Sequence, residues 1–530
     1  MVLDQVRVST RHTLNCANEA TLAAVESPFS LGPMDHTVSS MLTIEAILVY
    51  RKPKTVSDDN FLLVERLRVA ASHLLDYYPH LTGRLQQNPV TQAPEIGSLG
   101  TGAELWEAQC PRKLVSIAVS ALSARILVRH LPDSGNALLP IFHSTMGSVS
   151  HNPIFAIQHT RFGCGGVALG IRVHHQVCDA TGFMQLVRDL AEIYKQLRDS
   201  SPPTLVSPPE IFSHFRGTQS PSPSQKEAPA VDPLMFYLDE TTIVMPEVSE
   251  PSSVYTCPLR FDGQELVLLK NAATDPYAKE PTSFTRFELV SAYLYQRIYQ
   301  GRIQVLRDKG LTPDPDALQP LRDFGTTMDM RDSTRLKLPA RYFPNAVYCL
   351  STSASHKLLE KGALWKVAQV VHDLIHSVDM DSVKQQFEWI AAQPNKGQIR
   401  LKTLPRSCLV ATQWTKGKTY VGVDFDVADD GKRIPPSLVS PAFSEGYRVD
   451  GLAMILSTEE EVPSRRNRHS STRTNIPHAV DVNLTLDRLQ SRGATPVPGS
   501  TGPRPRTIIA PGLPWSSVVL GTPFDILLSP

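Results

Sequence analysis

The strongest constraint on the fold is a strand, a short turn and a helix that follow one another between residues 167 and 198. Apolar residues from 167 to 173 alternate with a period of two, which is typical of a half-buried strand. From about 181 to 198 apolar residues recur at helical spacing. The turn between them runs from His174 to Asp179 with the sequence HHQVCD. This pattern predicts a histidine at the end of a strand, immediately before a helix.

A histidine followed four residues later by an aspartate is compatible with several kinds of chemistry. A neutral imidazole is a good general base near pH 7, because its unperturbed pKa is about 6.5. His175 is therefore the candidate base, and His174 is expected to be structural. Asp179 either supports His175 or serves only as the N-cap of the helix. A shared metal ion is not expected, because no second cluster of His, Cys or Glu at ligand spacing lies nearby.

Charge and cysteine content exclude several classes of protein. The 530 residues include 53 Lys and Arg against 52 Asp and Glu, so nothing favours a nucleic-acid or membrane partner. The seven cysteines show no zinc-binding spacing and no complete disulfide framework. The first 30 residues lack the apolar core of a signal peptide, and no apolar stretch is long enough to span a bilayer. We therefore expect a cytoplasmic protein.

Helices and strands are interleaved in both halves of the chain, which predicts an α/β fold. A Pro- and Ser-rich linker at 217–235 separates an N-terminal domain, 1–216, from a C-terminal domain, 236–494, and a Pro- and Gly-rich tail covers 495–530. Beyond the opening motif, strands are predicted for 41–50, 345–351, 407–413, 419–426 and 449–456, and helices for 58–78, 286–300 and 356–377. Gly301 is expected to end the helix at 286–300.

Six segments, found in the same order, resemble the BAHD acyltransferases of plants and fungi. The segment that carries His175 and Asp179 is the most characteristic of them. The resemblance covers residues from about 28 to 492. Within the family, the chain is similar to divergent fungal members such as the trichothecene O-acetyltransferases. The other five segments are Leu31–Asp35, Tyr78–Arg84, Ser283–Ala292, Asp329–Val347 and Trp414–Phe425.

The resemblance implies both a fold and an activity. Two domains, each similar to chloramphenicol acetyltransferase, would enclose an active-site channel at their interface. An acyl group would pass from acyl-CoA, with acetyl-CoA the expected donor, to a hydroxyl or amine of a specialised metabolite. Acyl-CoA would be a co-substrate, with no bound cofactor and no metal. Family members are mostly monomers, so a monomer is expected, and its expected partners are acyl-CoA and a small-molecule acceptor.

The resemblance also implies roles for individual residues. His175 would act as the general base, and Asp179 would pair with Arg331 and so orient His175 without transferring a proton. Thr412 and Gln413 are candidates for hydrogen-bond donors to the oxyanion, and the alternative is that both are ordinary strand residues. These assignments come from the family motifs at the matching positions of this sequence.

The last motif departs from the family pattern. The usual Asp-Phe-Gly-Trp-Gly is replaced by a run that starts at Asp424 and Phe425 and ends at Lys432 (DFDVADDGK). Asp424 and Phe425 are expected to be structural. Lys432 is either a contact for a CoA phosphate or a solvated loop lysine. Ala180 and Pro344 also stand where the family usually has glycine.

Two other functions are compatible with the same motifs. A condensation-type domain would use the His-x-x-x-Asp pair but would take its acyl group from a carrier protein. A non-catalytic relative would keep the channel only to bind a small metabolite, which the altered segment after Asp424 would explain. The motifs of the second half favour free acyl-CoA as the donor.

Overall fold

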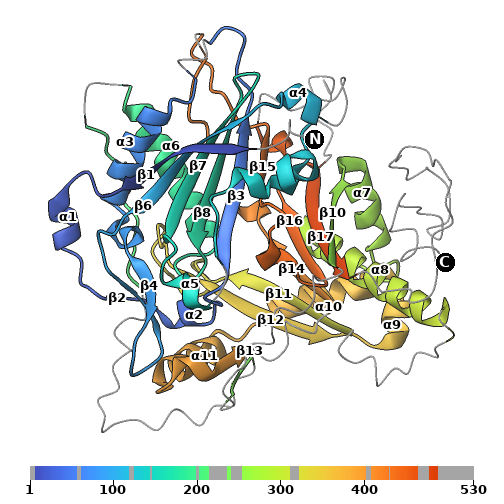
Figure 1. Cartoon of the computed structure of the whole chain (residues 1–530). Coiled ribbons are helices and arrows are strands. Elements are labelled where there is room, and N and C mark those ends of the chain that lie inside the picture. Colours follow the sequence, from blue (N-terminus) through green and yellow to red (C-terminus); the bar gives the residue numbers. More distant parts are fainter. Residues whose placement is uncertain are drawn as a thin grey trace.

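The computed structural model describes residues 6–56, 61–118, 125–143, 146–198, 202–213, 235–239, 254–308, 310, 322–401, 408–428, 430–462 and 477–487. This part of the chain forms a mixed α/β structure with two six-stranded sheets, as Figure 1 shows. The predicted α/β class is confirmed.

The first sheet is built mainly from the N-terminal half. Its strands, in order across the sheet, are β1 (Arg7–Leu14), β6 (Ala103–Cys110), β7 (Phe155–Phe162), β8 (Val167–His174), β3 (Thr43–Tyr50) and β15 (Leu438–Ser440). β6 and β7 run parallel, and the other neighbours are antiparallel. β15 comes from the second half of the sequence, and its Ser440 pairs with Ile47 of β3. This exchanged strand ties the two halves together.

The second sheet comes entirely from the C-terminal half. Its strands, in order, are β10 (Val254–Phe261), β17 (Val480–Asp487), β16 (Leu452–Leu456), β14 (Leu409–Gln413), β11 (Asp323–Asp329) and β12 (Val347–Ser353). β14 runs parallel to both β11 and β16, and the remaining pairs are antiparallel. Two small sheets contain β2 (Phe29–Ser30), β5 (Pro94–Gly97) and β4 (Arg84–Gln87), and β13 (Ile399–Leu401) and β9 (Phe236–Leu238).

Helices cover the sheets and complete two large apolar cores. α3 (Val64–Leu75) and α6 (Ala180–Gln196) pack together on the first sheet, and α8 (Arg286–Asp308) and α10 (Leu364–His376) pack together beside the second (Figure 1). The other helices are α1 (Glu19–Ala23), α2 (Pro33–His36), α4 (Leu114–Ile117), α5 (Met146–Val149), α7 (Gly263–Ala272), α9 (His356–Lys361) and α11 (Met380–Ala392).

The strand that leads to His175 is more deeply buried than its alternation predicts. Every residue of β8 is buried except Arg172, because β8 lies inside the sheet and both of its faces are covered. Ile171 belongs to the core beneath α3 and α6, and Ala168 belongs to a second core on the opposite face. A Cβ at Gly170 would lie 1.9 Å from the Leu138 carbonyl oxygen, so only glycine allows this approach.

Most predicted elements are present, with small differences at their ends. The strands predicted for 41–50, 345–351, 407–413 and 449–456 are confirmed as β3, β12, β14 and β16, and the helix predicted for 181–198 is confirmed as α6. The strands are short runs rich in apolar residues, and the helix has apolar residues at helical spacing after its cap at Asp179.

Three helix predictions were wrong in extent or continuity. The helix predicted for 58–78 is the shorter α3. Gly301 does not end α8, because the helix passes through it and buries it in the core. The helix predicted for 356–377 is divided into α9 and α10, because Gly362 adopts an extended backbone after α9. Packing therefore overrides the local preference of Gly301, whereas Gly362 interrupts a helix.

Residues 419–426 do not form the predicted strand. Gly422 has a φ of 77°, which an extended strand does not permit. The carbonyl oxygen of Val423 accepts a hydrogen bond of 2.6 Å from the Tyr50 hydroxyl, a side chain of the first sheet. The apolar residues of this segment therefore anchor a loop to the other half of the chain.

The predicted domain boundary cannot be followed through the linker. All of 217–235 except Met235, and the whole tail 495–530, lie outside the described residues. The division into domains stays a prediction. Within the ranges given above, no helix is long and apolar enough to cross a bilayer.

Candidate active site

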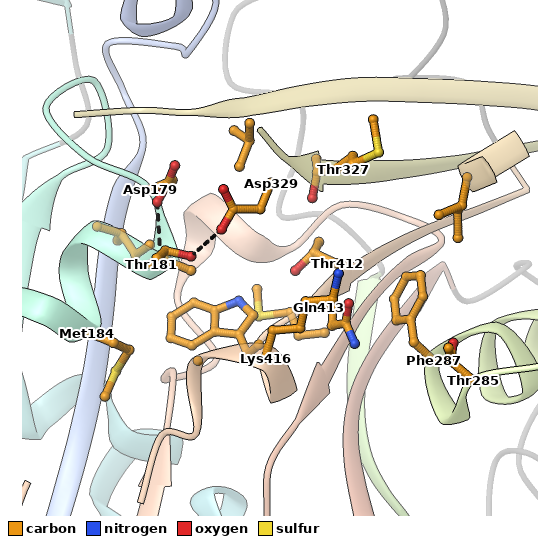
Figure 2. Close-up of a pocket in the computed structure, with 18 of the residues that line it drawn as sticks. Asp179, Thr181, Met184, Thr285, Phe287, Thr327, Asp329, Thr412, Gln413 and Lys416 are labelled. Atoms are coloured by element: carbon orange, nitrogen blue, oxygen red, sulfur yellow. Dashed lines mark hydrogen bonds between the residues drawn. The ribbon is translucent and has the colours of Figure 1, made fainter. Parts of the chain in front are cut away.

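A pocket of about 290 Å³ contains His175, and its lining residues lie between Ile44 and Met184 in the first half and between Thr285 and Met454 in the second. Figure 2 shows part of its lining, which comes from α6, α8, β11 and β14. Its polar lining residues include Asp179, Thr181, Asp329, Thr412, Gln413 and Lys416, and its apolar lining residues include Ile44, Met184, Trp414 and Met454. The pocket thus brings together motifs that lie more than 200 residues apart in the sequence.

His175 lies directly after β8, where the chain turns toward α6. Its backbone N–H donates to the Leu42 carbonyl at 3.0 Å, and its own carbonyl accepts from Nδ2 of Asn345 at 2.9 Å. Burial lowers the pKa of the His175 ring, although carbonyl groups around the ring and the charge of Asp179 act in the opposite direction. A ring with a lowered pKa is neutral at pH 7, which is the state that a general base requires.

Asp179 is the N-cap of α6 and the ion-pair partner of Arg331 at the same time. Its Oδ1 accepts from the backbone N–H groups of Thr181 (3.0 Å) and Gly182 (3.1 Å). Arg331 approaches with two nitrogens, Nη1 to Oδ2 at 2.9 Å and Nη2 to Oδ1 at 3.0 Å. The backbone N–H of Ala346 donates to Oδ2 at 2.7 Å. These five hydrogen bonds hold both carboxylate oxygens of Asp179 in place within the protein.

Arg331 connects this carboxylate to the second half of the chain. Its Nε donates to the Tyr342 carbonyl (2.9 Å), Nη2 to the Pro344 carbonyl (2.7 Å) and Nη1 to Oδ1 of Asp329 (3.1 Å). Burial opposes the charge of Arg331, but the carboxylates of Asp179 and Asp329 prevail and raise its pKa above the usual value. The guanidinium is therefore charged, and all of its nitrogens have partners.

The first turn of α6 lies very close to the second half. A Cβ at Gly182 would come within 2.2 Å of the Phe343 carbonyl oxygen, so this position requires glycine. The Thr181 hydroxyl donates to Oδ2 of Asp329 at 3.0 Å, and Figure 2 shows Thr181 between Asp179 and Asp329. The N-terminal turn of α6, which follows His175, is thus fixed by contacts from both halves of the chain.

A second buried aspartate, Asp35, helps to fix the backbone of His175 through Asn345. Asp35 Oδ1 accepts from both the backbone N–H (3.0 Å) and Nδ2 (2.8 Å) of Asn345, the same Nδ2 that donates to the His175 carbonyl. Asp35 Oδ2 accepts from the Gly32 N–H at 2.7 Å. Burial raises the pKa of Asp35 to about 7, against the effect of these hydrogen bonds. Asp35 and Asn345 are positioning residues that the sequence motifs contained but did not connect.

Thr412 and Gln413 lie at the end of β14 and line the same pocket as His175. Both are partly exposed there. Nε2 of Gln413 donates to the Thr415 hydroxyl at 2.9 Å, which commits one of its amide hydrogens. The second amide hydrogen of Gln413 is not used by this bond, so both Thr412 and Gln413 stay candidates for a hydrogen-bond donor toward a reacting atom.

Asp424 and Phe425 lie away from this pocket and face the first half of the chain. Asp424 Oδ2 pairs with Nζ of Lys195, near the far end of α6, at 3.2 Å. Phe425 is fully buried, with its ring edge-on to Tyr50 and Tyr194. These contacts fit a structural role, and neither residue lines the His175 pocket.

Lys432 is also absent from the lining of the His175 pocket. It belongs to an exposed loop, where its Nζ lies 2.5 Å from Oδ2 of Asp430, and its side chain is 82% exposed. It lines a separate pocket together with Arg51 and Arg433. Lys416, which sequence analysis did not select, is a basic residue that does line the His175 pocket.

The same pocket wall contains a group that sequence analysis missed. Glu288, His372 and His376 come together from α8 and α10, although 84 residues separate Glu288 from His372. A sequence signal existed, since two histidines four residues apart on a predicted amphipathic helix share one face. Only the packing of α8 against α10 supplies the carboxylate.

Comparison with known proteins gives one consistent result. The model of the Transferase family matches residues 8–428. Spermidine sinapoyl-CoA acyltransferase of Arabidopsis thaliana is 24% identical over 468 residues, which are 88% of this chain and 91% of the relative. The 3'-N-debenzoyl-2'-deoxytaxol N-benzoyltransferase of Taxus canadensis is 30% identical over 182 residues, 33% of this chain and 38% of the relative.

Solved structures show the same fold at low sequence identity. Vinorine synthase matches with a TM-score of 0.61 and 14% identity, over 91% of this chain and 95% of that structure. F. graminearum TRI101 complexed with coenzyme A and deoxynivalenol matches with a TM-score of 0.61 and 15% identity, over 87% and 95%. The two-domain acyltransferase fold implied by the sequence motifs is therefore present.

Proposed function

Because the chain belongs to the Transferase family of acyl-CoA-dependent BAHD acyltransferases, we propose that it transfers an acetyl group from acetyl-CoA to a secondary metabolite. The acceptor atom is a hydroxyl oxygen or an amine nitrogen, and His175 is the general base. The observation that carries this proposal is the position of His175 in a pocket formed by both halves, with a lowered pKa and a backbone held by Asn345.

The proposed reaction requires one proton to move twice. His175 accepts the proton of the acceptor as its oxygen or nitrogen attacks the carbonyl carbon of the thioester. The tetrahedral intermediate then expels the CoA sulfur, and the sulfur accepts that proton from His175. The carbon–sulfur bond is broken, an ester or amide is formed, and the ring returns to its neutral state.

The intermediate carries negative charge on the former carbonyl oxygen, which needs a hydrogen-bond donor. We assign this role to the Thr412 hydroxyl, which lines the pocket, with the second amide hydrogen of Gln413 as the alternative donor. Asp179 acts as a positioning residue, because its carboxylate is occupied by Arg331 and by backbone N–H groups.

A small acyl group suits the size of the pocket. Its volume of about 290 Å³ lies at the lower end of the range for small-molecule sites. Bulky apolar side chains, among them Met184, Trp414 and Met454, contribute to its walls. Because the acceptor also has to fit in this pocket, a small acyl group such as acetyl suits it better than a large one.

We also propose that the chain divides into two domains near 217–235, with a tail beyond 494. Support comes from the two sheets, one built from strands up to His174 and the other from strands that begin at Val254. The exception is β15, which crosses from the second half to the first sheet.

A donor panel tests the proposed function without a known acceptor. Purified protein is incubated with acetyl-, malonyl-, benzoyl- and longer acyl-CoAs, and both the melting temperature and the slow release of thiol are recorded. Acetyl-CoA is expected to raise the melting temperature, since a ligand that binds only the folded state stabilises it. It is also expected to release thiol faster in wild type than in His175→Ala.

Other results of this panel contradict specific parts of the proposal. A preference for benzoyl-CoA or a longer donor would overturn the acetyl assignment alone. No stabilisation and no thiol release with any donor would favour a carrier-protein donor or a non-catalytic binding protein. Turnover of a carrier-linked acyl group would then identify the first of these two.

A further inference from the structure

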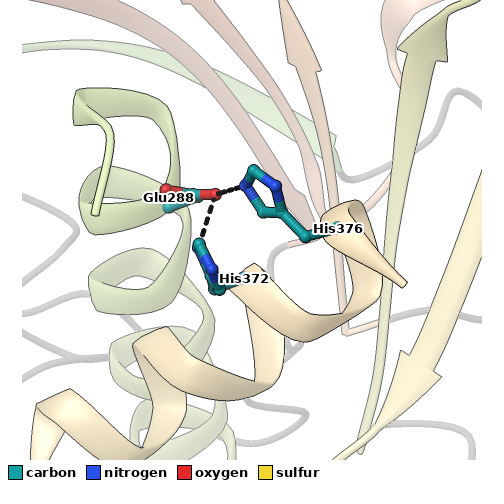
Figure 3. A group of neighbouring side chains, drawn as sticks. All are labelled: Glu288, His372 and His376. Carbon is teal, nitrogen blue, oxygen red and sulfur yellow. Dashed lines mark hydrogen bonds and ion pairs between the residues drawn. The ribbon is translucent and has the colours of Figure 1, made fainter. Parts of the chain in front are cut away.

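Glu288, His372 and His376 form a compact group of metal-ligating side chains, and Figure 3 shows all three. His372 and His376 lie one turn apart on α10, with their rings stacked at a centroid distance of 4.0 Å. Glu288 lies in the first turn of α8. Its Oε1 is 3.2 Å from Nδ1 of His372 and 3.0 Å from Nε2 of His376.

The distances match the geometry of a shared ion. Two ligand atoms of a tetrahedral zinc site, with bonds of about 2.0–2.1 Å, lie about 3.3 Å apart. The potential ligand atoms of the three residues all lie within 4.8 Å of one another, and both measured nitrogen–oxygen distances are close to the tetrahedral value. The stacked rings are only 28° from parallel, so at least one imidazole has to turn out of the stack to place all three residues around one cation.

The carboxylate of Glu288 is fixed before any ion arrives. Its Oε2 accepts a hydrogen bond of 2.6 Å from the backbone N–H of Thr285. This contact resembles the outer-shell hydrogen bonds that orient metal ligands in proteins. The other oxygen, Oε1, is left to face the two histidines.

A cation beside Glu288 would also be electrostatically favourable. Its side chain is only 2% exposed, and its ion-pair partners within the described ranges are His372 and His376, which are charged only when protonated. A buried carboxylate without a positive partner is costly. The exposed side chain of His376 leaves an open route by which an ion could enter.

We propose that Glu288, His372 and His376 bind one divalent transition-metal ion, for which Zn²⁺ is the best match. Two histidines and one glutamate are a known zinc ligand set, and a fourth position stays open for water. Glu288 and His376 both line the pocket that contains His175, so the ion would lie in the pocket wall. It would join α8 to α10 and take no part in the proton transfer assigned to His175.

Titration of the full chain with ZnCl2 tests this proposal. The protein is first treated with a chelator and dialysed, and binding is then followed by calorimetry and by the melting temperature. We expect one ion per chain at this site and a rise in melting temperature. His372→Ala, His376→Ala and Glu288→Gln are each expected to weaken binding by at least about tenfold, because each removes one ligand.

A surface pair supplies the matched control. Nε2 of His12 lies 2.6 Å from Oε1 of Glu107, and this pair belongs to no three-ligand group in the described part of the chain. His12→Ala is expected to leave the affinity for Zn²⁺ unchanged. Because the His376 side chain is 54% exposed, His376→Ala should fold even if Glu288→Gln does not. Wild type that binds no Zn²⁺, or His376→Ala that binds as tightly as wild type, would overturn the proposal.

Discussion

Replacement of His175 with alanine is expected to reduce the rate of acyl transfer by about 10²–10⁴-fold. A positioned general base typically contributes that factor, which corresponds to about 3–5 kcal/mol of activation free energy. The effect should appear in kcat, because the base stabilises the transition state and contributes little to binding of the donor in the ground state. Steady-state thiol release with the preferred acyl-CoA measures it.

Binding of the donor distinguishes a lost base from a damaged pocket. The backbone N–H and carbonyl of His175 are bonded to Leu42 and Asn345, and alanine retains both backbone groups. His175→Ala should therefore keep the rise in melting temperature that acyl-CoA produces in wild type. A folded His175→Ala protein with a rate within about tenfold of wild type would contradict the assignment of the base.

Replacement of Asp179 with alanine is expected to lower the free energy of unfolding by about 3–5 kcal/mol. The change removes one side of a buried ion pair and leaves the Arg331 guanidinium with only Asp329 as a carboxylate partner. It also removes the N-cap of α6, a loss of about 0.5–2 kcal/mol taken alone. Urea denaturation measures the stability, and thiol release from the remaining folded protein should be reduced as well.

Two further variants separate the ion pair from the helix cap. Asp179→Asn keeps an oxygen that can accept from the N–H groups of Thr181 and Gly182, but it lacks the charge that faces Arg331. Asp379→Ala removes an exposed N-cap from α11, where no arginine is paired with it in the described contacts. Asp379→Ala should therefore cost only the cap. Equal losses in Asp179→Ala and Asp379→Ala would show that the Arg331 pair contributes nothing.

The segment around His175 could be predicted from the sequence because its signals are local. The alternation before His174, the cap at Asp179 and the helical spacing after it all lie within about 30 residues. The two interpretations of Asp179, as cap and as partner of Arg331, looked like alternatives in the sequence. The structure satisfies both, since a carboxylate has two oxygens and several lone pairs to share.

Contacts between distant segments could not be predicted in the same way. Nothing local in Asp35 or Asn345 indicates that one will bind the other, or that both will hold the His175 carbonyl. Thr285 and Glu288 have the spacing of a capping box and form one in the structure. The contact of the other Glu288 oxygen with His372 depends on helix packing. Such pairings depend on tertiary packing, which single-sequence patterns do not record.

The segment that ends in the altered motif illustrates the opposite error. Its apolar residues predicted a strand at 419–426, and Lys432 was a possible contact for a CoA phosphate. In the structure Gly422 turns the chain, and Phe425 fills the core of the first half instead. The described residues between Asp424 and Lys432 therefore do not line the pocket of His175, and changes there need not alter the base.

The pH dependence of thiol release, measured for wild type and His175→Ala, tests the central claim most directly. The neutral ring is the base, so the rate falls as pH decreases through the pKa of His175. Burial lowers that pKa, so the acidic limb of the wild-type profile should have its midpoint below about 6.5. This limb is expected to disappear in His175→Ala. An acidic limb that persists unchanged in His175→Ala would show that another group accepts the proton.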